Sequence, residues 1–249
     1  KSGVANMFRK ILFALMVLTL GTSHIKLTEY SSEYMPDIYD FADTGFKRSV
    51  TSAVVIFTFD NEKEPLGAGS GNYFRYGKYR FIVTASHVVE DSTHIIIQER
   101  GPNAETARVI HNDLENDIAI LVLENRLKFT KPAWFALDHK LEYGEPIYYT
   151  GNPGATPFFP VAGMFVESRD KYLLTNMFAW PGSSGAVVFD DYGHIVGVVS
   201  SVMVAVEMGL PQIVPEVCKL GDIRKLDLDL LEGKLKDAKN SDKRRDANK

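Results

Sequence analysis

The sequence predicts an all-β protein of the sandwich or barrel type. Short runs rich in β-branched and aromatic residues recur along the chain, and turn residues such as Gly, Pro, Asn and Asp separate them. Regular short strands between turn signals are typical of sandwiches and barrels. The first series of runs comprises Thr51–Phe59, Gly69–Phe74, Tyr79–Thr84, Thr93–Gln98, Thr106–His111 and Ile118–Glu124.

A second series of the same kind follows, so the chain contains two sets of about six strands each. Its runs are Trp134–Leu137, Pro146–Thr150, Phe159–Val166, Tyr172–Phe178, Gly185–Phe189 and His194–Met203, with Gln212–Pro215 closing the series.

The character of the sequence changes after Gly221. Ile223, Leu226, Leu230 and Leu231 fall at helical spacing, which predicts one amphipathic helix packed on the second set of strands. From Lys234 the chain is charged and has few apolar residues, so we expect a frayed, solvated tail there.

Composition indicates an ordinary globular chain. The 249 residues are 45% hydrophobic and 24% charged, with a net charge of −4 and a pI near 5.9. This balance gives no sign of a nucleic-acid or anionic-membrane surface. A single cysteine, Cys218, excludes an intrachain disulfide, and we expect it to be a small buried side chain.

The N-terminal segment resembles a secretory signal. In residues 7–23, Arg9 and Lys10 precede an apolar run that ends in Gly21-Thr22-Ser23. The apolar run is short for a membrane span, so we expect a secreted or periplasmic protein with no stable membrane span. The alternatives are an uncleaved N-terminal anchor, which would hold the protein at a membrane, or a core helix.

The best candidate for a nucleophile is Ser184, in the stretch Trp180–Asp191. Gly182 and Gly185 flank it, and glycines permit the sharp turn that exposes a serine hydroxyl. Such a turn can also aim the backbone N–H groups of Gly182 and Ser184 at one point, as in an oxyanion hole. The alternative for these residues alone is an ordinary surface turn.

A serine nucleophile needs a base and a group that orients the base. His87 lies near the end of the apolar run Phe81–Val89, and Asp117 precedes the apolar run that begins at Ile118. The order His, Asp, Ser is that of chymotrypsin-like enzymes and differs from the subtilisin and α/β-hydrolase orders, which disfavours an α/β-hydrolase esterase. Asp113 competes with Asp117 for the orienting role.

These motifs together resemble the chymotrypsin-fold (trypsin-like) serine proteases, nearest to the bacterial high-temperature-requirement type. The matching stretches are Gly69-Ser70-Gly71, Thr84-Ala85-Ser86-His87-Val88, Asn116-Asp117-Ile118-Ala119, Gly151-Asn152-Pro153, Pro181-Gly182-Ser183-Ser184-Gly185 and Gly197-Val198-Val199-Ser200. Two positions depart from the family pattern: Ser183 replaces an Asn or Asp, and Ala186 replaces a glycine. Because Ser183 carries no charge, we expect no activation by an ion pair with a new N-terminus.

The resemblance implies two six-stranded antiparallel Greek-key barrels with a C-terminal helix and with the site between them. We therefore expect residues 1–23 to be a signal peptide with an N-terminal extension and 24–47 a lead-in segment. Residues 48–130 would form the first barrel, 131–220 the second, and 221–249 the helix and charged tail. The remaining residues leave no room for a PDZ domain, so we expect the type without one.

The function that follows is a serine endopeptidase with His87, Asp117 and Ser184 as its catalytic triad and with no cofactor or metal. Its partner would be a protein or peptide substrate, and nucleic acid is not expected. The alternative is an inactive relative that binds peptides or proteins on the same double barrel. We expect activity to rise with pH as His87 loses its proton.

The resemblance also implies a substrate pocket, formed by Phe178, Ala179, Trp180, Ser200, Ser201 and Val202. A pocket for Lys or Arg needs a carboxylate at its base, because an unpaired buried cation is costly. None of these residues is acidic, and the branched side chain of Val202 would partly fill the pocket. We therefore expect small or medium aliphatic residues at the substrate position before the cleaved bond (P1).

Overall fold

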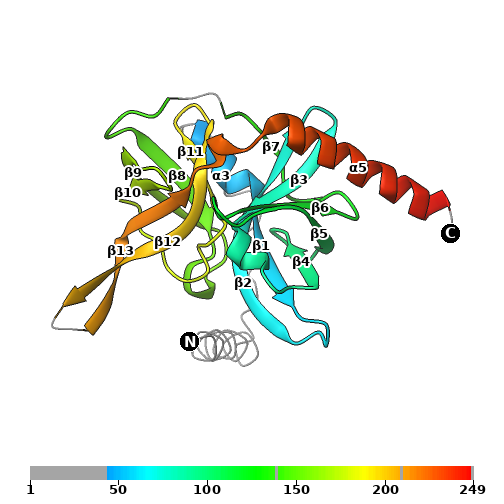
Figure 1. Ribbon diagram of the computed structural model, residues 1–249, viewed down its shortest axis with the longest axis horizontal. Helices are drawn as coiled ribbons and strands as arrows, with labels where there is room; N and C mark the ends of the chain where they lie inside the picture. Colours follow the sequence, from blue (N-terminus) through cyan, green and yellow to red (C-terminus); the bar gives the residue numbers. More distant parts are fainter. Residues whose placement is uncertain (1–43, 138–139, 208–209, 248–249) are drawn as a thin grey trace.

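The computed structural model describes residues 44–137, 140–207 and 210–247. Its described part is mostly β-structure, and Figure 1 shows two β-units side by side with a long helix at the C-terminal end. The proposed signal segment and most of the lead-in lie outside the described residues. Among the described helices, none is both long and apolar enough to cross a membrane.

The first unit is a barrel. Within the described ranges its six strands are β1 (Ala53–Phe59), β2 (Pro65–Tyr76), β3 (Tyr79–Thr84), β4 (His94–Gln98), β5 (Ala104–Asp113) and β6 (Ile118–Leu123). They pair antiparallel in the order β1-β4-β5-β6-β3-β2, and the pairing of β1 with β2 closes the sheet.

The second unit repeats this plan. Its described strands are β8 (Pro146–Gly151), β9 (Phe159–Ser168), β10 (Leu173–Thr175), β11 (Val187–Asp190), β12 (Ile195–Glu207) and β13 (Leu210–Gly221). They form a closed barrel in the order β10-β13-β12-β11-β8-β9. In both barrels the first strand pairs with the second and the fourth, and the third with the sixth. The predicted all-β double barrel with a C-terminal helix is confirmed.

The start and end of the second barrel differ from the prediction. The run predicted at Trp134–Leu137 is the short strand β7 (Ala133–Trp134), which pairs parallel with β2 of the first barrel. The second barrel begins at β8 instead, and the closing strand extends well beyond Gln212–Pro215. A β-rich run shows that a strand forms, but its alternation does not reveal which strand it joins.

An unpredicted helix, α3 (Thr44–Ser52), precedes β1 and takes two residues of the strand expected at Thr51–Phe59. It contacts both barrels. The Ser49 hydroxyl lies 3.0 Å from Thr150 Oγ1 of β8, and Asn72 of β2 donates to the Ser49 carbonyl and, at 2.8 Å, to Ser52 Oγ. The β-branched residues near its C-terminal end hid this helix, because they favour strands.

The C-terminal helix α5 (Leu228–Ala247) packs on the first barrel, and the prediction that it covers the second was wrong. Lys234 Nζ donates to the Ile110 carbonyl of β5, and Arg108 of β5 donates to Asp242 at 3.0 Å. The expected tail from Lys234 is helical through Ala247. Leu235 and Ala238 continue the buried stripe, and the charged residues between them lie at the surface.

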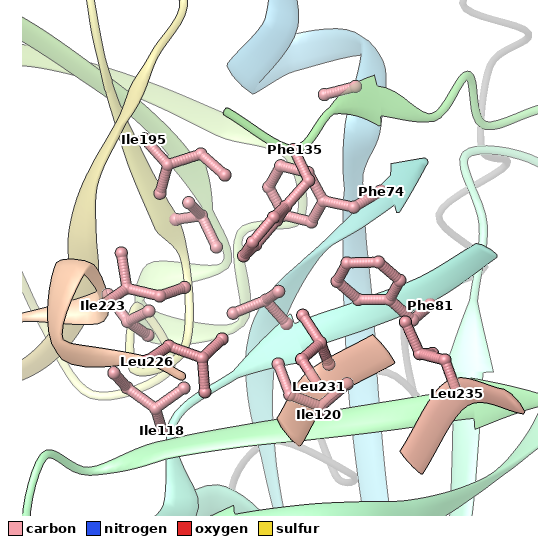
Figure 2. Packing of buried hydrophobic residues seen from close by; sticks show 14 of the residues in the cluster. Phe74, Phe81, Ile118, Ile120, Phe135, Ile195, Ile223, Leu226, Leu231 and Leu235 are labelled. Carbon is pink, nitrogen blue, oxygen red and sulfur yellow. The ribbon is translucent and has the colours of Figure 1, made fainter. Parts of the chain in front are cut away.

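A hydrophobic cluster joins the two barrels and α5 (Figure 2). In this view the rings of Phe74, Phe81 and Phe135 lie above Leu231 and Leu235 of α5. The ring centroids of Phe81 and Phe135 are 5.2 Å apart at 65°, an edge-to-face arrangement that adds to the gain from burial. The same cluster includes Ile118 and Ala85, so it supports the segments that carry the candidate site.

Candidate active site

His87 lies on the one-turn helix α4 (Ser86–Val89), directly after β3. Its side chain is 35% exposed, so one edge of the imidazole can meet a substrate. The other edge faces Asp117, whose Oδ2 lies 2.8 Å from His87 Nδ1. The backbone N–H of His87 also donates to Asp117 Oδ1, at 2.9 Å. The carboxylate thus holds both the backbone and the ring of the same residue.

Asp117 stands at the entrance of β6 with a positive φ of 55°, which aspartate tolerates better than most residues. Burial by itself would raise the pKa of Asp117. Hydrogen bonds from the His87 ring, the charge of that ring, and bonds from Ser200 and the His87 backbone together outweigh burial and lower this pKa. The group is therefore a carboxylate at neutral pH and can stabilise a protonated His87.

The competing residue, Asp113, serves the turn before β6. Its carboxylate accepts from the backbone N–H groups of Glu115 and Asn116 and from the Asn116 side chain at 2.7 Å. Within the described residues the aspartate bonded to His87 is Asp117, as the sequence order suggested.

The nucleophile segment forms a tight turn. Ser183 N–H donates to the Trp180 carbonyl at 2.8 Å, and Gly182 at the third position has φ 102°. Pro at the second position and a glycine with positive φ at the third favour a type II turn. Gly185 has φ 89°, and a Cβ there would collide with the Ser70 carbonyl and Thr84 Oγ1. Only glycine fits at this position.

The amides of Gly182 and Ser184 make no hydrogen bond to any other group in the described part of the chain. Ser184 N–H and Gly182 N–H are the pair that the sequence suggested for an oxyanion hole. Two unbonded amides beside a partly exposed serine can donate to an oxygen that gains negative charge.

Ser184 lies against the segment that carries His87. A Cβ placed on Gly69 would approach both the Val88 side chain, at 2.8 Å, and the Ser184 carbonyl, at 3.1 Å. Among the described residues, Ser184 Oγ makes no hydrogen bond, to His87 or to another group. Nucleophile–base bonds are often long until a substrate tightens them.

Ser183, the residue before the nucleophile, is fully buried. Within the described residues, no charged side chain bonds to it. Its hydroxyl oxygen lies 3.3 Å from the Tyr149 hydroxyl and accepts from the Trp180 amide. Tyr149 in turn donates to the Phe178 carbonyl at 2.6 Å. An uncharged set of hydrogen bonds occupies the place where trypsin-like zymogens use an acidic residue.

The proposed pocket residues differ in their exposure and contacts. Phe178 and Trp180 are about 40% exposed, at 39% and 40%, whereas Ala179 is buried and Val202 packs against the core of the second barrel. The side chain of Ser200 has a different contact: its hydroxyl donates to Asp117 Oδ2 at 2.5 Å. Ser201 is exposed on β12.

Sequence reasoning placed Ser200 in the pocket and missed its bond to Asp117. The two residues are 83 positions apart, and no local pattern reveals a pair formed between barrels. The motifs at Gly69-Ser70-Gly71 and Gly151-Asn152-Pro153 were noted without a role. In the structure, Asn152 Nδ2 donates to Ser70 Oγ, and Ser70 Oγ donates to the Gly182 carbonyl of the nucleophile turn.

A double β-barrel in which a His–Asp pair of one barrel faces a serine turn of the other defines the chymotrypsin-like class. Residues 69–198, just over half of the chain, match the trypsin-like peptidase domain family. The chain therefore belongs to this family, and the resemblance inferred from its motifs is confirmed.

The chain is similar to bacterial serine endoproteases of the high-temperature-requirement (HtrA) type. A probable periplasmic serine endoprotease DegP-like of Rhizobium meliloti (strain 1021) is 30% identical over 144 residues, or 54% of this chain and 28% of the relative. The periplasmic pH-dependent serine endoprotease DegQ of Escherichia coli (strain K12) is 26% identical over 154 residues, or 58% of this chain and 33% of the relative. The chain thus spans about a third or less of these relatives.

Solved structures show the same fold. The serine endoprotease from Yersinia pestis matches 78% of this chain and 66% of its own, with a TM-score of 0.60 and 18% identity. An HtrA-type protease solved with a tripeptide gives a TM-score of 0.61 at 17% identity, over 76% of this chain and 61% of its own.

Proposed function

We propose that this chain is a serine endopeptidase in which Ser184 is the nucleophile, His87 the general base and acid, and Asp117 the group that orients His87. The observation that supports this most strongly is the Asp117 carboxylate, which bonds both the His87 amide and Nδ1 and also accepts from Ser200. A carboxylate on Nδ1 fixes the tautomer that leaves Nε2 free to accept a proton from a serine.

In the proposed reaction Ser184 Oγ attacks the carbonyl carbon of a peptide bond while His87 Nε2 takes its proton. The carbonyl oxygen becomes an oxyanion, to which the unbonded amides of Gly182 and Ser184 donate. Each such donor is worth about 3 kcal/mol of barrier lowering. His87 then protonates the leaving amine, and water hydrolyses the acyl-enzyme by the same steps in reverse order.

For specificity, we propose small or medium aliphatic residues at P1. Val202 supports this because it packs against the core cluster that includes the buried Ala179, and its branched side chain would limit the depth of a pocket there. A well-placed methylene in such a pocket contributes about 1–3 kcal/mol of discrimination. Profiling cleavage of a peptide library tests this point; a preference for Arg, Lys or Glu at P1 would show that the pocket lies elsewhere.

For location, we propose a secreted or periplasmic protein in which residues 1–23 are a signal peptide with an N-terminal extension. The relatives in Rhizobium meliloti and Escherichia coli are named periplasmic endoproteases, and residues 7–23 have the pattern of a signal. Fractionation of cells that express the full chain, with N-terminal sequencing of the product, tests both claims.

Labelling with a fluorophosphonate tests the central claim without knowledge of the substrate. The reagent should modify Ser184 in the intact chain and should leave Ser184→Ala unlabelled. Ser168→Ala is the matched control, because Ser168 is an exposed serine on β9 and lies outside the proposed pocket residues. Labelling that persists in Ser184→Ala, or an intact chain that is not labelled and does not cleave a peptide library, would favour the inactive peptide-binding alternative.

A further inference from the structure

The strand β2 of the first barrel contacts the nucleophile turn of the second barrel directly. Ser70 N–H donates to the Ser184 carbonyl at 2.7 Å, and Ser70 Oγ donates to the Gly182 carbonyl at 2.6 Å. Ser70 is fully buried, so these bonds are shielded from water. One residue of β2 therefore fixes two carbonyl groups, one at each end of the Gly182–Ser184 segment.

The hydroxyl of Ser70 is fully used. It donates one hydrogen bond, to Gly182, and accepts two from Asn152, from the backbone N–H at 3.0 Å and from Nδ2 at 2.9 Å. A serine hydroxyl offers one donor and two acceptor positions, so this geometry leaves it no freedom to rotate to other partners. Asn152 is itself held, because its Oδ1 accepts from the Phe158 amide at 2.9 Å.

The loop after Asn152 holds the preceding peptide group. Gly154 N–H donates to the Pro181 carbonyl at 2.9 Å. In a planar trans peptide the carbonyl and the N–H of the next residue point in opposite directions. The bond to the Pro181 carbonyl therefore directs Gly182 N–H away from the loop, and this is the amide assigned to the oxyanion hole.

From this geometry we propose that Ser70 and Asn152 are positioning residues of the peptidase. They hold the Gly182 carbonyl from one side while Gly154 holds the Pro181 carbonyl from the other, which keeps the Gly182 amide unbonded and aimed at the substrate oxygen. The inference rests on the proposed role of Ser184. It adds that the first barrel, through Ser70, supplies part of the support of the oxyanion hole as well as His87 and Asp117.

Loss of the Ser70 hydroxyl should act on the transition state more than on substrate binding. In Ser70→Ala the Gly182 carbonyl loses its side-chain donor, so the Gly182 amide is held by the bond from Gly154 to the Pro181 carbonyl without support on its other side. We expect kcat to fall by about 10- to 100-fold with KM within about threefold, since the loss of one complete oxyanion donor costs about 10²- to 10³-fold. Ser70→Cys, with a weaker donor of similar size, should be intermediate.

A second readout separates positioning from a general loss of structure. A peptide aldehyde binds as an adduct of Ser184 whose oxygen occupies the oxyanion hole, so its Ki should rise in Ser70→Ala by the factor lost in kcat/KM. Ser49→Ala is the matched control. It removes a fully buried serine hydroxyl that bonds the Phe46 carbonyl and Thr150 Oγ1 and makes no hydrogen bond to the turn, and kcat and Ki should stay within about twofold.

The experiment measures kcat, KM and aldehyde Ki for the intact chain, Ser70→Ala, Ser70→Cys, Ser49→Ala and Ser184→Ala. An inactive Ser184→Ala with Ser70→Ala no slower than Ser49→Ala overturns this inference and leaves the proposed function standing. An active Ser184→Ala overturns both. If Ser70→Ala is not recovered folded, Ser70→Cys decides the matter: a normal kcat and Ki in that variant contradict the inference.

Discussion

In the described residues each barrel holds a histidine bonded to an aspartate, and the two pairs are nearly alike. In the first barrel, His87 donates its amide to Asp117 at 2.9 Å, and its Nδ1 lies 2.8 Å from the carboxylate. In the second, the distances from His194 to Asp190 are 2.8 and 3.1 Å. The two imidazoles are also equally accessible, at 35% and 32%.

The pairs differ in how their two members are brought together. Asp190 and His194 are four residues apart in the turn between β11 and β12, so their pair belongs to one barrel. Asp117 and His87 are 30 residues apart, and Asp117 also accepts from Ser200 of the second barrel. A His–Asp pair can thus arise within a single turn. The bond from Ser200 of the second barrel to Asp117 is what marks the His87–Asp117 pair as the candidate site.

The largest expected effect follows from this contrast. His87→Ala and Ser184→Ala should each lower kcat by at least about 10⁴-fold, and the double variant should be hardly worse, because the groups act as a unit. His194→Ala should keep kcat within about twofold and lower the free energy of unfolding by about 1–2 kcal/mol, because a buried carboxylate loses a partner.

Measuring kcat for peptide cleavage and the free energy of unfolding by chemical denaturation in each variant separates a catalytic loss from a loss of stability. Comparable losses of kcat in His87→Ala and His194→Ala would mean that the two pairs are not functionally distinct and that the site is misplaced.

A second, smaller effect tests the core beneath both pairs. Ile118 beside Asp117 and Ile195 beside His194 belong to the cluster that also buries Leu235 of α5. Leu235→Ala should lower the free energy of unfolding by about 2–5 kcal/mol, the usual range for a buried leucine. Activity per folded molecule should stay normal, because α5 supplies no group to the site.

Leu230 of the same helix is 46% exposed, whereas Leu235 is 2% exposed. Leu230→Ala is therefore the control, and we expect it to cost about 0.5 kcal/mol or less. If urea denaturation gave the same loss of unfolding free energy for Leu235→Ala and Leu230→Ala, α5 would not pack on the first barrel through Leu235.

Much of the fold could be predicted because strand formation depends on local sequence. The run Tyr79–Thr84 matches β3 residue for residue, since Gly77 marks the turn before it and its residues are mostly aromatic or β-branched. The partner of a strand or helix depends on distant residues. For that reason β7 and α5, whose partners lie in the first barrel, were both assigned to the second.

The candidate site divides in the same way. The pairing of His87 with Asp117 was expected from motif order, and the structure brings these two side chains together. The contacts of Ser70 and Ser200 were not foreseen, because serine is common in strands and turns and its partners here lie 112 and 83 residues away. Such contacts become visible only when the two barrels are packed together.

The smallest effect we expect is the contribution of Asp117 ionisation to stability. Its folded pKa lies below the ordinary value of 3.8, because bonds and charge from His87 and a bond from Ser200 outweigh burial. A lowered pKa stabilises the folded state above the unfolded value, and that stability is lost as pH falls through the folded pKa. Burial opposes this lowering of the pKa, so the contribution to stability is small.

The difference in free energy of unfolding between the intact chain and Asp117→Asn should therefore shrink as pH falls below 3.8. Ser200→Ala, which removes one bond, should show part of this pH dependence. Urea denaturation between neutral pH and pH values below 3.8 measures it, and parallel curves for the intact chain and Asp117→Asn would contradict it.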